Sequence, residues 1–121
     1  MFEKAGIMKS PIHVSLVMGV ASGMPCKPGW IQMLVDELDP STHWQTIAIG
    51  QAEDVWPTLR KTAELGGNVR TGMEDTFYKL DGSKARNSGE LIAELVKVCR
   101  EVGREPANPV ETRELMGMAP L

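Results

Sequence analysis

An arginine and two adjacent carboxylates lie within residues 66–76, whose sequence is Gly-Gly-Asn-Val-Arg-Thr-Gly-Met-Glu-Asp-Thr. If this segment is a β-strand, side-chain alternation places Arg70 and Glu74 on one face, whereas Asp75 turns to the other face or enters the following loop. Neighbouring carboxylates repel each other, so a buried strand end keeps them only beside a cation, a metal ion or a proton that the site uses. The pattern therefore favours acid–base or metal chemistry, and the spacing alone leaves open an ordinary ion-pair network at a strand end.

The composition is that of one globular domain with a hydrophobic core. The chain has 121 residues, of which 42% are hydrophobic and 24% charged, and its formal net charge is −3. Because charges of both signs are interspersed, we expect no binding to nucleic acid or to an anionic membrane. Apolar runs such as Val14–Val20 are too short to span a bilayer, and Met1–Gly6 lacks the apolar core of a signal peptide. Cys26 and Cys99 lack the spacing of metal ligands, so we expect buried or half-buried thiols and a cytoplasmic protein.

Strands and helices are predicted to alternate along the chain. Apolar and β-branched residues predict strands near residues 11–19, 44–49 and 68–75. Helical spacing predicts two helices, over residues 30–38 and 53–65. Two more helices are predicted by their opening residues, which are the pair Asn87 and Glu90 with the spacing of a capping box, and then Asn108-Pro109. Alternating βα units imply a parallel sheet covered by helices.

The predicted units have the length of those in a (β/α)8 barrel, about 30 residues each. A parallel sheet of only three strands would leave two apolar edges unpaired, which promotes association. The chain also begins on Met1–Gly6, which looks like the end of a helix. We therefore expect residues 1–121 to form one partial domain of a larger fold.

Several motifs together resemble one known family. They are residues 66–76, then Asn87-Ser88-Gly89-Glu90-Leu91-Ile92, then Gly103-Arg104-Glu105, and finally Glu111-Thr112-Arg113-Glu114-Leu115. In this order they are similar to the β-keto acid cleavage enzymes, of which the 3-keto-5-aminohexanoate cleavage enzyme of lysine fermentation is the best-known member. The resemblance runs through nearly the whole chain, and its central motif is specific.

The resemblance implies an α/β fold, in which this chain forms the last three βα units of a (β/α)8 TIM barrel and a C-terminal helix. It also implies a zinc-dependent reaction of a β-keto acid with acetyl-CoA that gives acetoacetate and a new acyl-CoA. Carried over by position, Glu74 is expected to be a zinc ligand, Asp75 the catalytic base and Arg70 its catalytic partner. Elementary chemistry agrees, since catalytic groups of such barrels follow the carboxyl ends of strands, zinc accepts carboxylate oxygen and a guanidinium holds carboxylates.

The sequence departs from the family pattern at the other zinc ligands. The family binds zinc through a His-x-His pair as well, whereas His13 and His43 stand alone here, at the starts of their predicted strands. Those positions belong to the face of a barrel opposite the active site, which favours structural or surface histidines. The chain by itself is therefore expected to be an incomplete catalyst, and the alternative is an inactive barrel fragment that self-associates or complements a missing N-terminal part.

One further loop is a candidate for ligand contact. Residues 19–23, Gly-Val-Ala-Ser-Gly, follow a predicted strand. Such a loop can present backbone N–H groups to a phosphate or a carboxylate, although an ordinary turn has the same composition. The basic segment from Lys79 to Arg86 is expected to be a solvated loop, and a CoA phosphate is its alternative partner.

Overall fold

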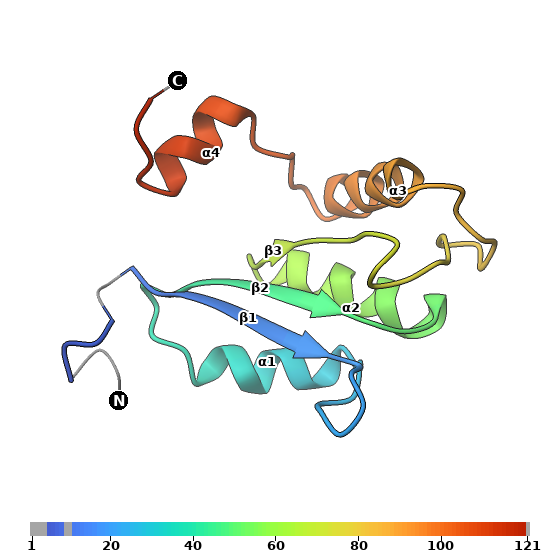
Figure 1. Ribbon diagram of the computed structural model, residues 1–121, viewed down its shortest axis with the longest axis horizontal. Helices are drawn as coiled ribbons and strands as arrows, with labels where there is room; N and C mark the ends of the chain where they lie inside the picture. Colours follow the sequence, from blue (N-terminus) through green and yellow to red (C-terminus); the bar gives the residue numbers. More distant parts are fainter. Residues whose placement is uncertain (1–4, 9–10, 121) are drawn as a thin grey trace.

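The computed structural model describes residues 5–8 and 11–120. The elements occur in the order β1 (His13–Met18), α1 (Gly29–Asp36), β2 (His43–Ala48), α2 (Ala52–Glu64), β3 (Asn68–Val69), α3 (Ser88–Glu101) and α4 (Pro109–Leu115) (Figure 1). Most of the predicted helix end at Met1–Gly6 lies outside the described residues. No helix within the described ranges is long and apolar enough to cross a membrane.

The three strands form one parallel sheet in the order β1-β2-β3. β1 and β2 run in register over their whole length, from the pair of His13 with His43 to the pair of Met18 with Ala48. The prediction of parallel strands that alternate with helices is therefore confirmed. The side chains of β1 alternate between the two faces of the sheet. Those on the face without helices are exposed: His13, Ser15 and Val17.

β3 is shorter than its sequence suggests, which corrects the predicted strand over 68–75. Only Asn68 and Val69 pair with β2, and residues 73–75 lie in a turn. The amide of Asp75 donates to the carbonyl of Gly72 at 2.9 Å, so the chain bends just where the strand was expected to end in carboxylates. Within the described residues, one edge of β1 and one edge of β3 have no strand beside them.

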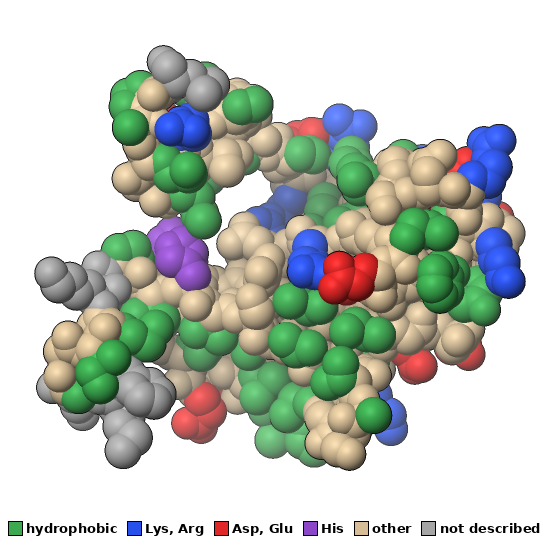
Figure 2. Space-filling view, viewed as in Figure 1, with side chains coloured by type: hydrophobic (Ala, Val, Ile, Leu, Met, Phe, Trp, Pro, Cys, Tyr) green, Lys and Arg blue, Asp and Glu red, His purple; other side chains and the backbone are tan. Residues whose placement is uncertain are grey.

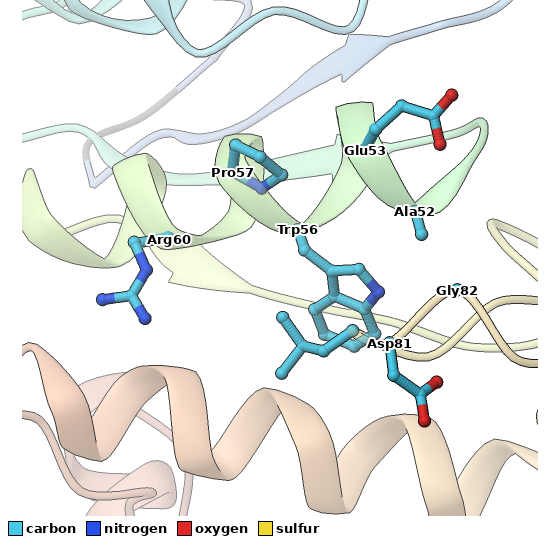
Figure 3. A pocket seen from close by; sticks show the side chains of 8 residues that line it. Ala52, Glu53, Trp56, Pro57, Arg60, Asp81 and Gly82 are labelled. Carbon is cyan, nitrogen blue, oxygen red and sulfur yellow. The ribbon is translucent and has the colours of Figure 1, made fainter.

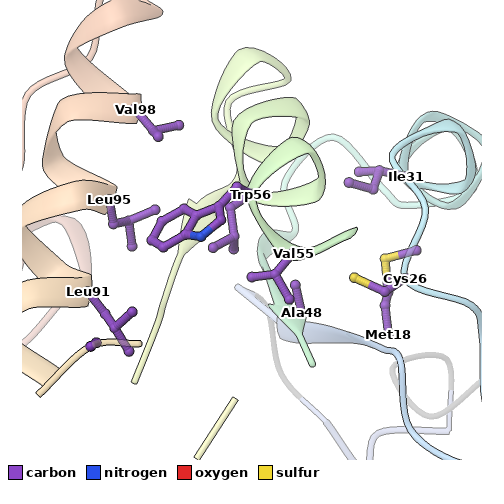
Figure 4. Packing of buried hydrophobic residues seen from close by; sticks show 11 residues of the cluster. Met18, Cys26, Ile31, Ala48, Val55, Trp56, Leu91, Leu95 and Val98 are labelled. Carbon is purple, nitrogen blue, oxygen red and sulfur yellow. The ribbon is translucent and has the colours of Figure 1, made fainter. Parts of the chain in front are cut away.

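The hydrophobic core lies between the sheet and the helices (Figure 4). Trp56 of α2 packs in the same cluster as one face of α3, which buries Leu91, Leu95 and Val98. Met18, Cys26 and Ile31 extend this cluster toward α1. Both cysteines are free thiols, with Cys26 buried and Cys99 half-buried, which confirms the expectation of unpaired buried thiols.

The turn before β3 depends on a close approach to an aromatic ring. Gly66 adopts a φ of +84°, which is the left-handed region typical of a residue that ends a helix. A Cβ atom on Gly67 would collide with the ring of Trp44 on β2. This contact brings β3 against β2, and it explains why two glycines stand in succession.

α4 stands apart from the rest of the chain. Asn108 caps it by accepting hydrogen bonds from the amides of Val110 and Glu111, and the Glu111 carboxylate accepts from the amide of Asn108. This reciprocal capping box with Pro109 in the first turn is the predicted start of the helix. None of its residues is buried. Its stability therefore depends on local caps, and a hollow separates it from the sheet in the space-filling view (Figure 2).

Candidate active site

Arg70 and Asp75 form a two-pronged ion pair directly after β3. Nε of Arg70 lies 3.1 Å from Oδ2 of Asp75, and Nη2 lies 2.8 Å from Oδ1. The Asp75 side chain is only 3% exposed, whereas that of Arg70 is 40% exposed. The hydrogen bonding that Arg70 donates to Asp75 is the main cause that raises the pKa of Arg70 above its ordinary value. The pair is thus a buried carboxylate whose two oxygens are held by a permanent, partly exposed cation.

Glu74 lies beside this pair but faces water. Its Oε2 is 3.7 Å from Nη2 of Arg70, and its side chain is 85% exposed. At that distance and exposure the ion pair contributes little to stability. The two adjacent carboxylates therefore occupy opposite environments, with Asp75 enclosed and Glu74 available to a ligand.

Backbone hydrogen bonds fix the turn that carries the two carboxylates. The carbonyl of Gly72 accepts from the amides of Asp75 at 2.9 Å and Thr76 at 3.1 Å, and the amide of Gly50, just beyond β2, donates to the carbonyl of Asp75 at 3.1 Å. The amide of Met73 donates to the hydroxyl of Ser88, the first residue of α3, at 3.3 Å. The turn is therefore tied to both β2 and α3. Among the described residues, the hydroxyl of Thr71 is the one buried side-chain polar atom without a hydrogen-bond partner.

Arg104 anchors the other end of this segment. Its Nη1 donates to the carbonyls of Gly67 at 2.5 Å and Ala63 at 3.3 Å, which connects the chain after α3 to the end of α2 and the start of β3. Sequence reasoning included Arg104 in a motif but gave it no task. The signal that could have found it is the glycine pair at 66–67, whose carbonyls need a donor where a helix ends.

The described residues do not by themselves form a zinc site. They contain no group of three or more His, Cys, Asp and Glu side chains placed to hold one metal ion. Glu74 offers a single exposed carboxylate, and His13 and His43 lie at the amino ends of their strands, at the opposite end of the sheet from the turn (Figure 1). A structural or catalytic zinc site takes at least three protein ligands. Glu74 would therefore have to share a metal ion with donors outside these residues.

The loop of residues 19–23 is closed by local backbone hydrogen bonds. The amide of Gly19 donates to the carbonyl of Met24 at 2.8 Å, and that of Gly23 donates to Val20 at 3.0 Å. Ser22 adopts a φ of 62°, and a Cβ atom on Gly19 would collide with the carbonyl of Ile49. Two of the N–H groups that could face an anion are thus engaged in backbone hydrogen bonds, which favours the alternative of an ordinary turn.

The segment from Lys79 to Arg86 is an exposed turn, as expected, except for half-buried Lys79 and buried Ala85. It lies over α2 and borders a cavity of about 460 Å³, which has Trp56 at its base and Glu53, Arg60 and Asp81 around it (Figure 3). The Trp56 indole donates to the carbonyl of Tyr78 at 3.1 Å, which holds the turn in place. Arg86 is paired with Glu90 at 2.6 Å. The charges around the cavity are of both signs, and no residue of the Arg70 site borders it.

Comparison with known proteins assigns this chain to a family. Residues 1–118 match the sequence profile of the family described as beta-keto acid cleavage enzyme. The chain belongs to this family. The match covers every element of the fold and includes Arg70, Glu74 and Asp75.

Three curated members of the beta-keto acid cleavage enzyme family show the range of the similarity. The chain is 32% identical over 116 residues to the 3-keto-5-aminohexanoate cleavage enzyme of Acetoanaerobium sticklandii, covering 96% of this chain and 42% of that protein. It is 29% identical over 119 residues to the 3-oxoadipate:acetyl-CoA acetyltransferase of Cupriavidus necator, covering 96% of this chain and 41% of that protein. It is also 29% identical over 108 residues to the 3-dehydrocarnitine:acetyl-CoA trimethylamine transferase of Rhizobium meliloti, covering 89% and 35% respectively. The chain thus spans about 40% of the length of the first two of these relatives.

Proposed function

We propose that this chain is the C-terminal part of a zinc-dependent β-keto acid cleavage enzyme and forms the last three βα units of a (β/α)8 TIM barrel with a final helix. Three observations support the placement. The strands are parallel and joined by helices, β1 exposes the side chains of one face and the sheet has two free edges within the described residues, and the relatives are more than twice as long as the chain. In a closed barrel, that exposed face would point inward and the two edges would find neighbouring strands.

The proposed reaction exchanges acyl groups between a β-keto acid and acetyl-CoA. The keto acid gives up its acyl group to CoA, and the acetyl group joins the remaining two-carbon carboxylate, so the products are acetoacetate and a new acyl-CoA. The names of the Cupriavidus and Rhizobium relatives both include acetyl-CoA, which supports acetyl-CoA as the co-substrate. Their names give different acids, so the test of this reaction uses a panel of β-keto acids.

The paired side chains Arg70 and Asp75 would carry the proton chemistry. Asp75 is the proposed base that removes a proton next to the keto group. Both of its oxygens accept hydrogen bonds from Arg70 and its side chain is enclosed, so the guanidinium competes with an incoming proton for these oxygens. Arg70 is partly exposed, so an incoming substrate carboxylate can take over one prong of the guanidinium. That exchange would bind the substrate and open a lone pair on Asp75 in one step.

Glu74 is the proposed metal ligand, and its exposure beside Arg70 supports that role. The remaining donors would come from parts of the enzyme that this chain lacks. Zinc content is therefore a property expected of the completed barrel, and the 121-residue chain is expected to hold zinc weakly, if at all.

A chimera tests the proposal most sharply. Residues 1–118 would replace the matching segment of the Acetoanaerobium sticklandii enzyme, and acetoacetate formation from acetyl-CoA would be measured with a panel of β-keto acids. Far-ultraviolet circular dichroism and gel filtration establish that the chimera is folded. Turnover of at least one keto acid supports the proposal, whereas a folded, zinc-loaded chimera without turnover contradicts it.

The second candidate is an inactive fragment that associates with itself or with a complementary chain. The exposed Val17 on the uncovered face of β1, together with the unpaired edge of β1 in the described part of the chain, favours this alternative. Sedimentation of the 121-residue chain separates the two candidates. A homo-oligomer that cannot bind the N-terminal part of a relative would favour the fragment.

A further inference from the structure

A cavity of about 760 Å³ lies between α4 and the amino ends of the strands, and we call it the α4 cavity. His13, His43 and Arg104 reach it from three different segments, and Asn68 and Gln45 add side-chain amides. Figure 2 shows a histidine at the mouth of the hollow below α4. This volume is in the range of small-molecule sites. The α4 cavity lies at the end of the sheet opposite Arg70 and Asp75, so it plays no part in the proposed reaction.

The charges around the α4 cavity are one-sided. No Asp or Glu is among the described residues that line it. Glu105 and the two acidic residues of α4, Glu111 and Glu114, line a neighbouring hollow instead. Arg104 makes its two backbone bonds through Nη1 alone, which leaves its Nε and Nη2 groups for another acceptor. The cavity is therefore a concave surface with a fixed cation and two imidazoles but no counter-charge.

The two imidazoles are held next to each other by the sheet. His13 and His43 are register partners, and their rings stack with centroids 4.9 Å apart and planes at 20°. Parallel strands thus place two donors side by side at the wall of the cavity.

The spacing of the rings favours an anion over a metal ion. Like-placed nitrogens of nearly parallel rings are separated by about the distance between the ring centroids. A metal ion bonded to both at about 2.1 Å needs nitrogens no more than about 4.2 Å apart. A phosphate or carboxylate group offers two oxygens, so each ring can donate to one of them at about 2.9 Å. The stacked rings therefore suit a head group with two oxygens better than a single metal ion bonded to both rings.

We propose that the α4 cavity binds a small organic anion, with its phosphate or carboxylate group between the histidine pair and Arg104. Apolar side chains complete the wall: Trp44, Leu115 and Met116. They provide a surface for a short hydrocarbon part of the ligand. Because α4 supplies part of this wall and has no buried residues, the ligand would also stabilise the position of α4.

The test is a titration of the 121-residue chain followed by NMR of its histidine ring nitrogens. The probes are inorganic phosphate, hexanoate and, at equal ionic strength, sodium chloride. Saturable shifts of the His13 and His43 rings with phosphate or hexanoate, but not with chloride, support the proposal, and the tighter of the two identifies the preferred head group.

Substitutions separate a real site from general anion binding. His13→Gln and His43→Gln should each weaken binding by roughly tenfold, which is the loss of one charge-assisted hydrogen bond. Arg86→Gln removes an exposed cation on the far side of the chain and should leave binding unchanged. Shifts that chloride reproduces, or affinity that survives both histidine substitutions, would overturn the proposal. Saturable zinc binding by the two rings without any response to the anions would overturn it as well.

Discussion

Arg70 and Asp75 lie five residues apart and share two hydrogen bonds across the turn that follows β3. The side chain of Arg70 is 40% exposed and that of Asp75 only 3%, so the enclosed carboxylate contacts a cation that solvent can reach. This geometry ties the turn together, and in the proposed reaction it would allow an exchange of partners at Arg70. The two consequences can be measured separately, because the first concerns the stability of the free protein and the second the turnover proposed for the completed enzyme.

The pair should contribute measurably to folding. Arg70→Ala leaves an enclosed carboxylate without its partner and is expected to lower the free energy of unfolding by about 1–3 kcal/mol, a range reduced for the exposure of the arginine. In the Asp75→Asn background, Arg70→Ala should lower the free energy of unfolding clearly less, because residue 75 no longer carries a charge that needs a partner. Urea denaturation of the four proteins gives the coupling energy. Additive effects would show that the two side chains do not stabilise each other.

Two glycines of the same motif should respond differently to alanine. Gly67→Ala places a Cβ atom against the Trp44 ring, and the displacement of that ring is expected to cost about 1–3 kcal/mol. Gly72→Ala is the matched control, because a Cβ atom there meets only the hydroxyl of Ser88 at 3.8 Å. Its effect should stay within about 0.5 kcal/mol. Thermal unfolding of both variants provides the comparison, and equal losses would refute the role given to the Trp44 contact.

The start of α3 should carry a pH dependence. The backbone N–H of Arg86, and then its guanidinium, lower the pKa of Glu90 below its ordinary value of 4.5. Because the pKa in the folded state is the lower one, this stabilisation is fully present above pH 4.5 and is lost as the pH falls through the lowered value. Glu90→Gln should therefore flatten the acid side of the profile of melting temperature against pH. Identical acid profiles for the variant and the wild type would contradict this assignment.

The two thiols should react at different rates. Burial is the main cause that raises the pKa of Cys26, whose side chain also lies 3.5 Å from the hydroxyl of Thr58. Burial raises the pKa of half-buried Cys99 too, while Arg104 opposes the change. Since the thiolate is the reactive form, iodoacetamide at mildly alkaline pH should modify Cys99 first and Cys26 only after unfolding. Mass spectrometry of time points would identify the order, and prompt modification of Cys26 in the native chain would disprove its enclosure.

Local patterns in the sequence were sufficient for most of the fold. Runs of β-branched residues located β1 and β2 to within two residues at either end, and the caps at Asn87 and Asn108 placed the starts of α3 and α4. The capping box predicted at Asn87 is only half formed. Asn87 accepts from the amide of Glu90, whereas the Glu90 carboxylate bonds one residue earlier, to Arg86. Such signals are local, because they depend on residues three or four positions apart.

The geometry of the site could not be predicted from local patterns in the same way. The resemblance and the chemistry of the guanidinium implied Arg70 as the partner of Asp75, but an assumed strand placed Arg70 on one face with Glu74, and the pair forms through the turn after β3. The length of β3 depends on its pairing with β2, which no pattern within residues 66–76 encodes. The α4 cavity could not be predicted from the sequence either. It forms only when the register of β1 with β2 places the two histidines side by side and α4 lies over them. The sequence did place both histidines at the amino ends of their strands.

The central claim is that Asp75 is the base of a β-keto acid cleavage site whose zinc is held in part by Glu74. The most direct test is the rate of acetoacetate formation by Asp75→Asn in the chimera, measured together with its zinc content and compared with Glu74→Gln. We predict that Asp75→Asn retains zinc but loses turnover by at least about 100-fold, whereas Glu74→Gln loses both. Turnover by Asp75→Asn at the rate of the unsubstituted chimera would contradict the assignment.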